Sequence, residues 1–200
     1  MGFALEEVNF ALATMESTVD DRKWSSVKAF ATQVGLIGID GVELGVENLN
    51  VEMNVAEDGS DVVADFSENP LVIGAGLEYD ISLDFDGAMG PIVIAEGEAK
   101  FRIGDFLTAS GKIAFATRKE VIHLSDQSAI DANIMTLAGT DIGGFAGFGN
   151  DESPEESMGF SLNDIDFGMA YIKPSDIADE RSWVAFDGSA GYMVFKDPLI

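Results

Sequence analysis

Residues 1–13 read MGFALEEVNFALA, and residues 158–170 read MGFSLNDIDFGMA. Six of the thirteen positions are identical. The match continues to Arg22-Lys23-Trp24 and Arg181-Ser182-Trp183, with an offset that changes from 157 to 159 residues. Self-similarity at such a distance is the signature of a tandem repeat, in which each unit packs on its neighbours. The sequence therefore predicts one full unit over residues 1–157 and the opening strands of the next over residues 158–200, which complete the same fold.

Apolar and polar residues alternate in both copies, and the alternation slips by one residue at the same position. Two adjacent polar residues mark the slip, Glu6-Glu7 in the first copy and Asn163-Asp164 in the second. Alternation with a period of two indicates a strand with one buried face. A slip of one residue indicates a β-bulge or a corner. Because both copies share the slip, we expect it to be a feature of the fold.

The remaining chain shows strand character between turns. The stretch LEYDISLDFD over Leu77–Asp86 places its apolar residues on one face, and Gly41–Ala56 shows another slip of one residue. No segment carries a sustained helical period, and only Ser175–Glu180 suits a single helical turn. Further strands are expected at Val27–Ile39, Val62–Phe66, Leu71–Ile73, Pro91–Ala95, Ala99–Ile103, Ile113–Phe115, Val121–Leu124, Ile134–Leu137 and Ile142–Phe148, with turns at Asp58-Gly59-Ser60, Asn69-Pro70, Asp86-Gly87, Ser110-Gly111, Gly149–Pro154 and Lys173-Pro174. This pattern predicts an all-β fold, an elongated multi-stranded sandwich or solenoid-like repeat unit of about ten strands.

The charge limits the partners of this chain. Its 200 residues include 36 acidic and 11 basic ones, for a net charge of −25. Such a surface repels nucleic-acid phosphates and anionic membranes, and no apolar run has the length of a membrane-spanning helix. We therefore expect neither nucleic-acid binding nor membrane insertion. Hydrophobic residues make up 46% of the chain, enough for a core, and the acids keep such a β protein soluble and discourage pairing at its sheet edges.

The residues of the common catalytic sites are missing. The chain has no cysteine, and its one histidine, His123, lies in a strand-like run. Catalysis by Ser-His-Asp needs a histidine beside the serine, and zinc sites need several His or Cys ligands. Carboxylate pairs, which hydrolyse glycosides in some enzymes, occur here in no recognisable signature. We expect this chain not to be an enzyme and to require no cofactor.

Acidic turns are the candidate metal sites, and Ca²⁺ is the metal that carboxylate and carbonyl oxygens favour. Asp84 and Asp86 precede a turn glycine, Asp58 and Asp61 flank another turn, and Asp151 follows the glycine-rich stretch Gly143–Gly149. None of these stretches completes an EF-hand loop or the glycine-rich nonapeptide of a calcium β-roll. The sequence leaves open a calcium-stabilised module and a set of solvated turns.

An arginine precedes each tryptophan by two residues, as Arg22-Trp24 and Arg181-Trp183. Side chains two apart in a strand lie on the same face, so each pair is placed for a cation–π contact. Because both pairs occupy the same repeat position, we expect a structural role at the junction between units.

The Arg-x-Trp motif, the run of small residues after it and Gly38-Ile39-Asp40-Gly41-Val42 resemble modules of giant repetitive bacterial surface or secreted proteins of the adhesin-like kind. The resemblance implies an extracellular or cell-surface location, neighbouring repeats as partners, and a protein or glycan as a further surface partner. It implies a structural, spacer or adhesive function with no catalytic residues. A second hypothesis is a β-groove that binds a lipid or another hydrophobic ligand, and a third is a calcium-stabilised adhesion module.

Overall fold

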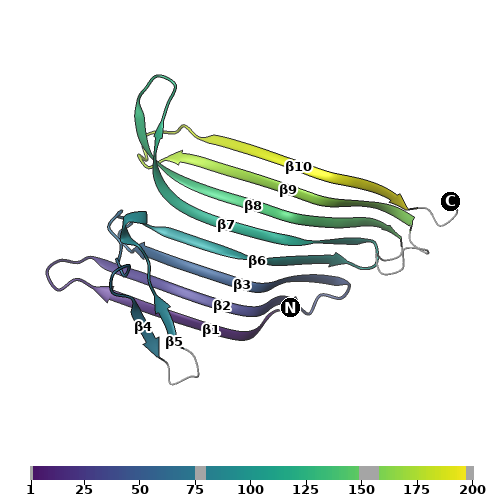
Figure 1. Ribbon diagram of the computed structural model, residues 1–200, viewed down its shortest axis with the longest axis horizontal. Helices are drawn as coiled ribbons and strands as arrows, with labels where there is room; N and C mark the ends of the chain where they lie inside the picture. Colours follow the sequence, from purple (N-terminus) through teal and green to yellow (C-terminus); the bar gives the residue numbers. More distant parts are fainter. Residues whose placement is uncertain (1, 75–79, 149–157, 197–200) are drawn as a thin grey trace.

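A computed structural model describes residues 2–74, 80–148 and 158–196. The all-β prediction is confirmed: the described residues form ten strands and a single 3₁₀ turn, η1 (Gly87–Met89). Eight strands form one antiparallel sheet in the order β1-β2-β3-β6-β7-β8-β9-β10, and β4 with β5 forms a separate two-stranded sheet. The small sheet crosses β1 and β2 near one end of the large one (Figure 1). The strands are β1 (Gly2–Glu16), β2 (Lys23–Ile37), β3 (Val42–Ala56), β4 (Leu71–Gly74), β5 (Asp80–Leu83), β6 (Ile92–Ile103), β7 (Leu107–His123), β8 (Ala129–Phe148), β9 (Met158–Pro174) and β10 (Trp183–Lys196).

The large sheet is open. β1 and β10 lie at its two edges, and no other described strand pairs with their outer sides. Among the described residues, a second layer exists only where β4 and β5 cover the large sheet (Figure 1).

Strands β6, β7 and β8 are longer than the alternation predicts. Pro91–Ala95 and Ala99–Ile103 fall almost entirely in β6, while Ile134–Leu137 and Ile142–Phe148 both lie in β8. The turn expected at Ser110-Gly111 is wrong, because Gly111 lies inside β7 and pairs with Ala99 of β6. Glycine is needed there for close approach: a Cβ at Gly111 would lie 2.5 Å from Ile142 Cδ1 and 2.7 Å from Ile142 Cα.

Further expectations also differ from the structure. The turn expected at Lys173-Pro174 is wrong, because both residues belong to β9 and pair with Asn133 and Ala132 of β8. The strand expected at Val62–Phe66 is a loop whose carbonyls accept side-chain hydrogen bonds, from Trp24 to Val62 and from Asn54 to Ala64. These bonds satisfy the loop backbone without a strand partner. The helical turn expected at Ser175–Glu180 is a reverse turn in which the Asp179 N–H donates to the Asp176 carbonyl. The turn expected at Gly149–Pro154 and part of the Leu77–Asp86 strand lie outside the described residues.

Residues with left-handed backbone conformations cross the large sheet in one row, here called the bulge row, and they explain the slips in the alternation. Glu7 and Asp164, in the paired polar residues of the two copies, both have left-handed backbone conformations, with φ of 48° and 54°. Asn48 in β3 and Asp141 in β8 have the same conformation, with φ of 52° and 53°, beside shifts in the strand register. An extra residue at a bulge reverses the phase of the alternation. Apolar residues before and after the row therefore remain on the same face.

Cross-strand pairing consequently separates the large sheet into an apolar face and a polar face. Partners in register share a face, and the unbroken β6–β7 ladder links both sides of the bulge row. The apolar face consists of Phe3, Leu5, Val8, Phe10 and Leu12 of β1; Val27, Ala29, Ala31, Val34 and Leu36 of β2; Leu44, Val46, Leu49, Val51, Met53 and Val55 of β3; Val93, Ala95, Ala99 and Phe101 of β6; Leu107, Ala109, Ile113 and Phe115 of β7; Met135, Leu137 and Ala146 of β8; Phe160, Leu162, Ile165, Phe167, Met169 and Tyr171 of β9; and Val184, Phe186, Ala190, Met193 and Phe195 of β10.

The core lies on the polar face, beneath β4 and β5. Leu83 and Phe85 are buried against Ala11 of β1 and Ile92 of β6, with Phe66 and Ile81 packed at the periphery. The alternation within Leu77–Asp86 is confirmed here, since Leu83 and Phe85 point inward while Asp84 and Asp86 are exposed. We call the segment between β3 and β6, which contains β4 and β5, the insertion. The polar residues beneath it are bonded to each other: the Ser26 hydroxyl donates to Asn54 Oδ1 at 2.8 Å, and both residues are fully buried.

Candidate interaction surfaces

The apolar face is the most distinctive surface of the molecule, because no described segment covers it. Its large side chains are exposed most at the two edges, where Phe10 of β1 is 65% exposed, and Phe186 and Phe195 of β10 are 70% and 79% exposed. Towards the middle, residues such as Val51 and Phe115 are only half-buried, by their strand neighbours. Soluble monomers rarely expose apolar patches beyond a few hundred Å², and larger ones mark interaction sites. The apolar face is therefore a candidate interaction surface.

Charges avoid the interior of this face. The charged residues that the register places on it lie at the end of the sheet where β1 finishes and β2 begins. They are Glu16, Lys23, Lys119, Asp131 and Lys173. An apolar interior with charge only at its border has the composition of a protein interface.

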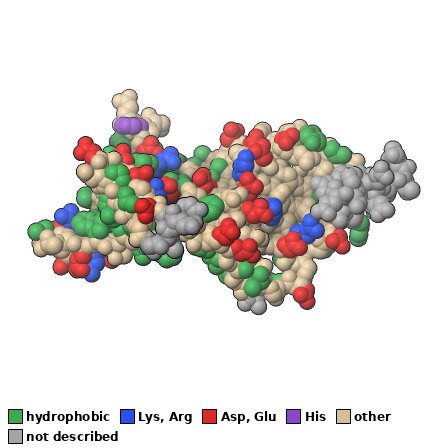
Figure 2. Space-filling view, turned by 60° about the horizontal axis from the view of Figure 1, so that its bottom comes forward, with side chains coloured by type: hydrophobic (Ala, Val, Ile, Leu, Met, Phe, Trp, Pro, Cys, Tyr) green, Lys and Arg blue, Asp and Glu red, His purple; other side chains and the backbone are tan. Residues whose placement is uncertain are grey.

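Several ion pairs lie on the polar face. Lys100 Nζ lies 2.6 Å from Glu47 Oε1, and Arg102 Nε lies 3.8 Å from Glu43 Oε2. Figure 2 shows acidic and basic side chains intermingled over one side of the molecule. These side chains are well exposed, so they add solubility more than stability.

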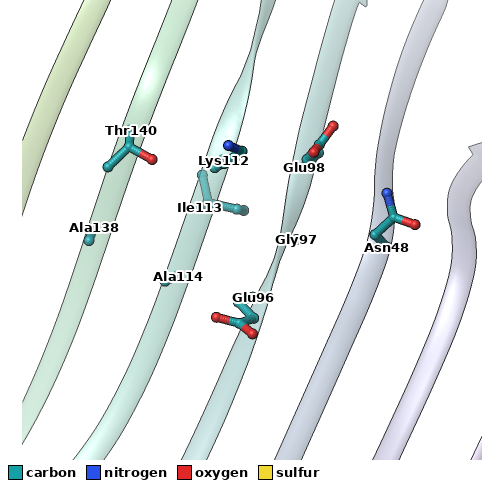
Figure 3. Close-up of a pocket in the computed structure, with 9 residues that line it drawn as sticks. All are labelled: Asn48, Glu96, Gly97, Glu98, Lys112, Ile113, Ala114, Ala138 and Thr140. Carbon is teal, nitrogen blue, oxygen red and sulfur yellow. The ribbon is translucent and has the colours of Figure 1, made fainter.

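A shallow trough of about 320 Å³ crosses the polar face at the bulge row. Figure 3 shows its lining on neighbouring strands, with Glu96 and Glu98 from β6, Lys112 from β7 and Asn48 from β3. Glu98 and Lys112 are cross-strand partners, so a negative and a positive side chain lie next to each other here. The described residues that line the trough include no histidine and no cysteine.

Four of the predicted calcium residues hold the insertion or its loops. Asp84 Oδ1 accepts a hydrogen bond of 2.5 Å from Lys28 Nζ of β2, and that bond holds the pKa of Asp84 below its usual value. Asp61 Oδ1 forms an ion pair of 2.5 Å with Lys119 Nζ of β7. Asp58 accepts from the Ser60 N–H, and Asp86 caps η1 by accepting from the Ala88 N–H. Asp151 lies outside the described residues.

Within the described part of the chain, no three His, Cys, Asp or Glu residues gather as a metal cluster. The four described aspartates occupy two separate places, the loop after β3 and the segment after β5. Calcium binding stays a prediction. The ion pair between Lys28 and Asp84 could not be predicted from the sequence, because the two residues are 56 positions apart.

Both Arg–Trp pairs form the contact that their spacing predicts. The guanidinium carbon of Arg22 lies 5.4 Å from the Trp24 ring centroid, and that of Arg181 lies 5.5 Å from the Trp183 ring centroid. An aspartate two residues before each arginine holds it in place: Asp20 accepts from Arg22 Nε at 2.8 Å, and Asp179 accepts from Arg181 Nε at 2.9 Å. Hydrogen bonds from Arg181 lower the pKa of Asp179 to about 2. The motif is therefore Asp-x-Arg-x-Trp, whereas the sequence alone indicated only its arginine and tryptophan.

The two tryptophans differ in what covers them. Trp24 Nε1 donates to the Val62 carbonyl at 2.7 Å, in the loop between β3 and β4. For Trp183 the described residues supply no acceptor, and β10 has no strand on its outer side where β2 has β3. The β10 edge is thus a second candidate surface, because no described strand or loop covers it as β3 and the Val62 loop cover β2.

The one histidine lies away from these surfaces. His123 is exposed at the end of β7 and pairs with Ala129 of β8 across the connecting turn. Figure 1 shows this hairpin projecting beyond the end of the sheet. That the chain is not an enzyme stays a prediction.

Neither a membrane-spanning helix nor a known relative identifies the partner of these surfaces. The described residues contain no helix that is both long enough and apolar enough to cross a membrane. Comparison with protein-family models, curated proteins and solved structures found no match for this chain.

Proposed function

We propose that this chain is a structural, non-catalytic module of a large repetitive extracellular or cell-surface protein, in which neighbouring copies share one continuous β-sheet. The proposal is carried by the equivalence of β1–β2 and β9–β10. Both pairs have the left-handed bulge residue, Glu7 or Asp164, and both have the Asp-x-Arg-x-Trp motif with its cation–π contact.

The order of the strands supports sharing of a sheet between copies. β9 pairs with β8 on the side that is a free edge in its counterpart β1. Similarly, β10 is free on the side where its counterpart β2 pairs with β3. A β3-like strand from a following copy fits the β10 edge, and its loop then covers Trp183 as Val62 covers Trp24. Strands lie about 4.8 Å apart, so each copy of six sheet strands adds roughly 29 Å to the sheet.

The test is a longer chain, in which residues 38–200 of a second copy follow Lys196. We expect small-angle scattering to show the particle lengthened by roughly 29 Å. We also expect Trp183 fluorescence, measured after Trp24→Phe and after Trp→Phe changes in the added copy, to move to shorter wavelength and resist acrylamide quenching. The matched control is the same longer chain with proline in place of Val51 and Met53 of the added copy, since proline cannot donate to a strand ladder. If Trp183 stays as accessible to acrylamide as in the 200-residue chain, the shared sheet is wrong.

A further inference from the structure

The apolar face leaves this chain with more surface than its mass explains. The chain has a mass of 21.3 kDa and an accessible surface of 12,937 Å². A compact monomer of that mass exposes about 9,000 Å². The excess is roughly 4,000 Å² per chain, or about 8,000 Å² for two chains, which is more than the roughly 2,000–5,000 Å² in total that obligate interfaces bury.

We propose that the apolar face is covered by the apolar face of a second copy of this chain, in a sheet-on-sheet dimer. Each apolar face spans all eight strands of the large sheet, and sheets that pack face to face do so through rows of alternating apolar residues. The second copy presents the same surface, so the two faces match in extent and in polarity.

The distribution of charge selects the face-to-face orientation for a second copy. Each chain carries a net charge of −25, so two copies repel each other in most orientations. Face-to-face packing is the orientation that directs the acid-rich polar faces outward. With the sheets about 10 Å apart, the two acidic layers lie roughly 20 Å apart. That separation exceeds the Debye length of about 8 Å at physiological salt, so the repulsion is largely screened.

The inference is independent of the proposed function, because it concerns the face of the sheet and the shared sheet concerns its edges. In an array, both would hold together: paired faces leave the β1 and β10 edges free to continue. If the native chain dimerises but the longer chain of the previous subsection is not extended, the face-to-face dimer is supported and the shared sheet is wrong.

The test is the mass of the native chain in solution, measured by sedimentation over a range of concentrations. We expect a species of twice 21.3 kDa. The variant is Ala95→Lys, in the middle of β6 on the apolar face, and the matched control is Ala114→Lys, on β7 but on the polar face opposite Glu96. A lysine buried between the sheets should raise the dissociation constant at least about 100-fold. The control should change it by no more than about threefold.

Folding of each variant is checked by far-ultraviolet circular dichroism. If Ala95→Lys does not fold, Phe10→Lys replaces it, since Phe10 is 65% exposed on an edge strand and lies outside the core beneath β4 and β5. A native chain that is monomeric at every concentration overturns the dimer. So does equal weakening by Ala95→Lys and Ala114→Lys.

The other occupant of an apolar face is lipid, and the same samples distinguish it. Flotation with vesicles of neutral phosphatidylcholine is measured for the native chain and for Ala95→Lys. A native chain that stays monomeric and floats with the vesicles, while Ala95→Lys does not, would assign the apolar face to lipid and overturn the dimer.

Discussion

The two ends of the large sheet carry the same repeated strand pair in different surroundings. In β1, Ala11 is 1% exposed beneath β5, whereas its counterpart Gly168 in β9 is exposed, with open space where a Cβ would lie. In β2, Ser26 is fully buried, whereas its counterpart Ala185 in β10 is exposed. The repeated strand pair alone therefore leaves these positions exposed to solvent. The insertion between β3 and β6 buries them, and the described chain supplies it only once.

The largest expected effect comes from loosening the insertion. Leu83 is fully buried between β5 and the large sheet, so Leu83→Ala should lower the free energy of unfolding by about 3 kcal/mol, from lost burial and the cavity left behind. Val72→Ala on β4, where the side chain is 57% exposed, is the control and should cost under about 0.5 kcal/mol. Urea unfolding at one fixed protein concentration measures both. If Leu83→Ala costs no more than Val72→Ala, the insertion does not stabilise the sheet.

A smaller effect should separate the two tryptophans. Trp24→Phe removes the hydrogen bond to the Val62 carbonyl and should cost about 1 kcal/mol. Trp183→Phe removes no hydrogen bond found among the described residues, so its effect should stay within about 0.5 kcal/mol. Both changes keep an aromatic ring beneath the arginine, so the comparison isolates the cover over the ring. Equal losses of stability in urea unfolding would contradict the difference between the two ends.

The smallest effect is a dependence on pH at the anchored end. The hydrogen bond from Lys28 holds the pKa of Asp84 below its usual value. A carboxyl with a lowered folded-state pKa stabilises the fold at pH above its unfolded pKa of about 3.9, and that stability is lost as the pH falls through the folded-state value. Asp84 is well exposed, so the loss should stay below about 1 kcal/mol. Unfolding measured between pH 6 and pH 3 should show this step in the native chain and in the control Asp80→Asn, and Asp84→Asn should lack it.

Local pattern was enough to predict most strands and the slips in the two repeated copies, but not the left-handed Asp141 inside β8. The doubled polar residues Glu6-Glu7 and Asn163-Asp164 interrupt an otherwise regular alternation, and the structure has a left-handed residue in each pair. The Arg–Trp contacts were predictable for the same reason, since residues two apart in a strand share a face. All of these features depend on residues that are close together in the chain.

Features that depend on distant residues were not predictable. The loop at Val62–Phe66 reads as a strand, but bonds from Trp24 and Asn54 hold it without a strand partner. The ion pairs of Asp84 with Lys28 and of Asp61 with Lys119 join residues from distant parts of the chain. No spacing in the sequence relates these residues to their partners.

The sequence by itself determined that the chain is a β protein, where its strands bulge, and that its opening strand pair recurs after residue 157, because these follow from alternation and from direct comparison of residues. Only the tertiary structure decided that eight strands form one open sheet, that β4 and β5 cover part of its polar face, and that no described segment covers its apolar face. The reason is that alternation separates two faces of a strand, but only the packing of distant segments decides which face is covered.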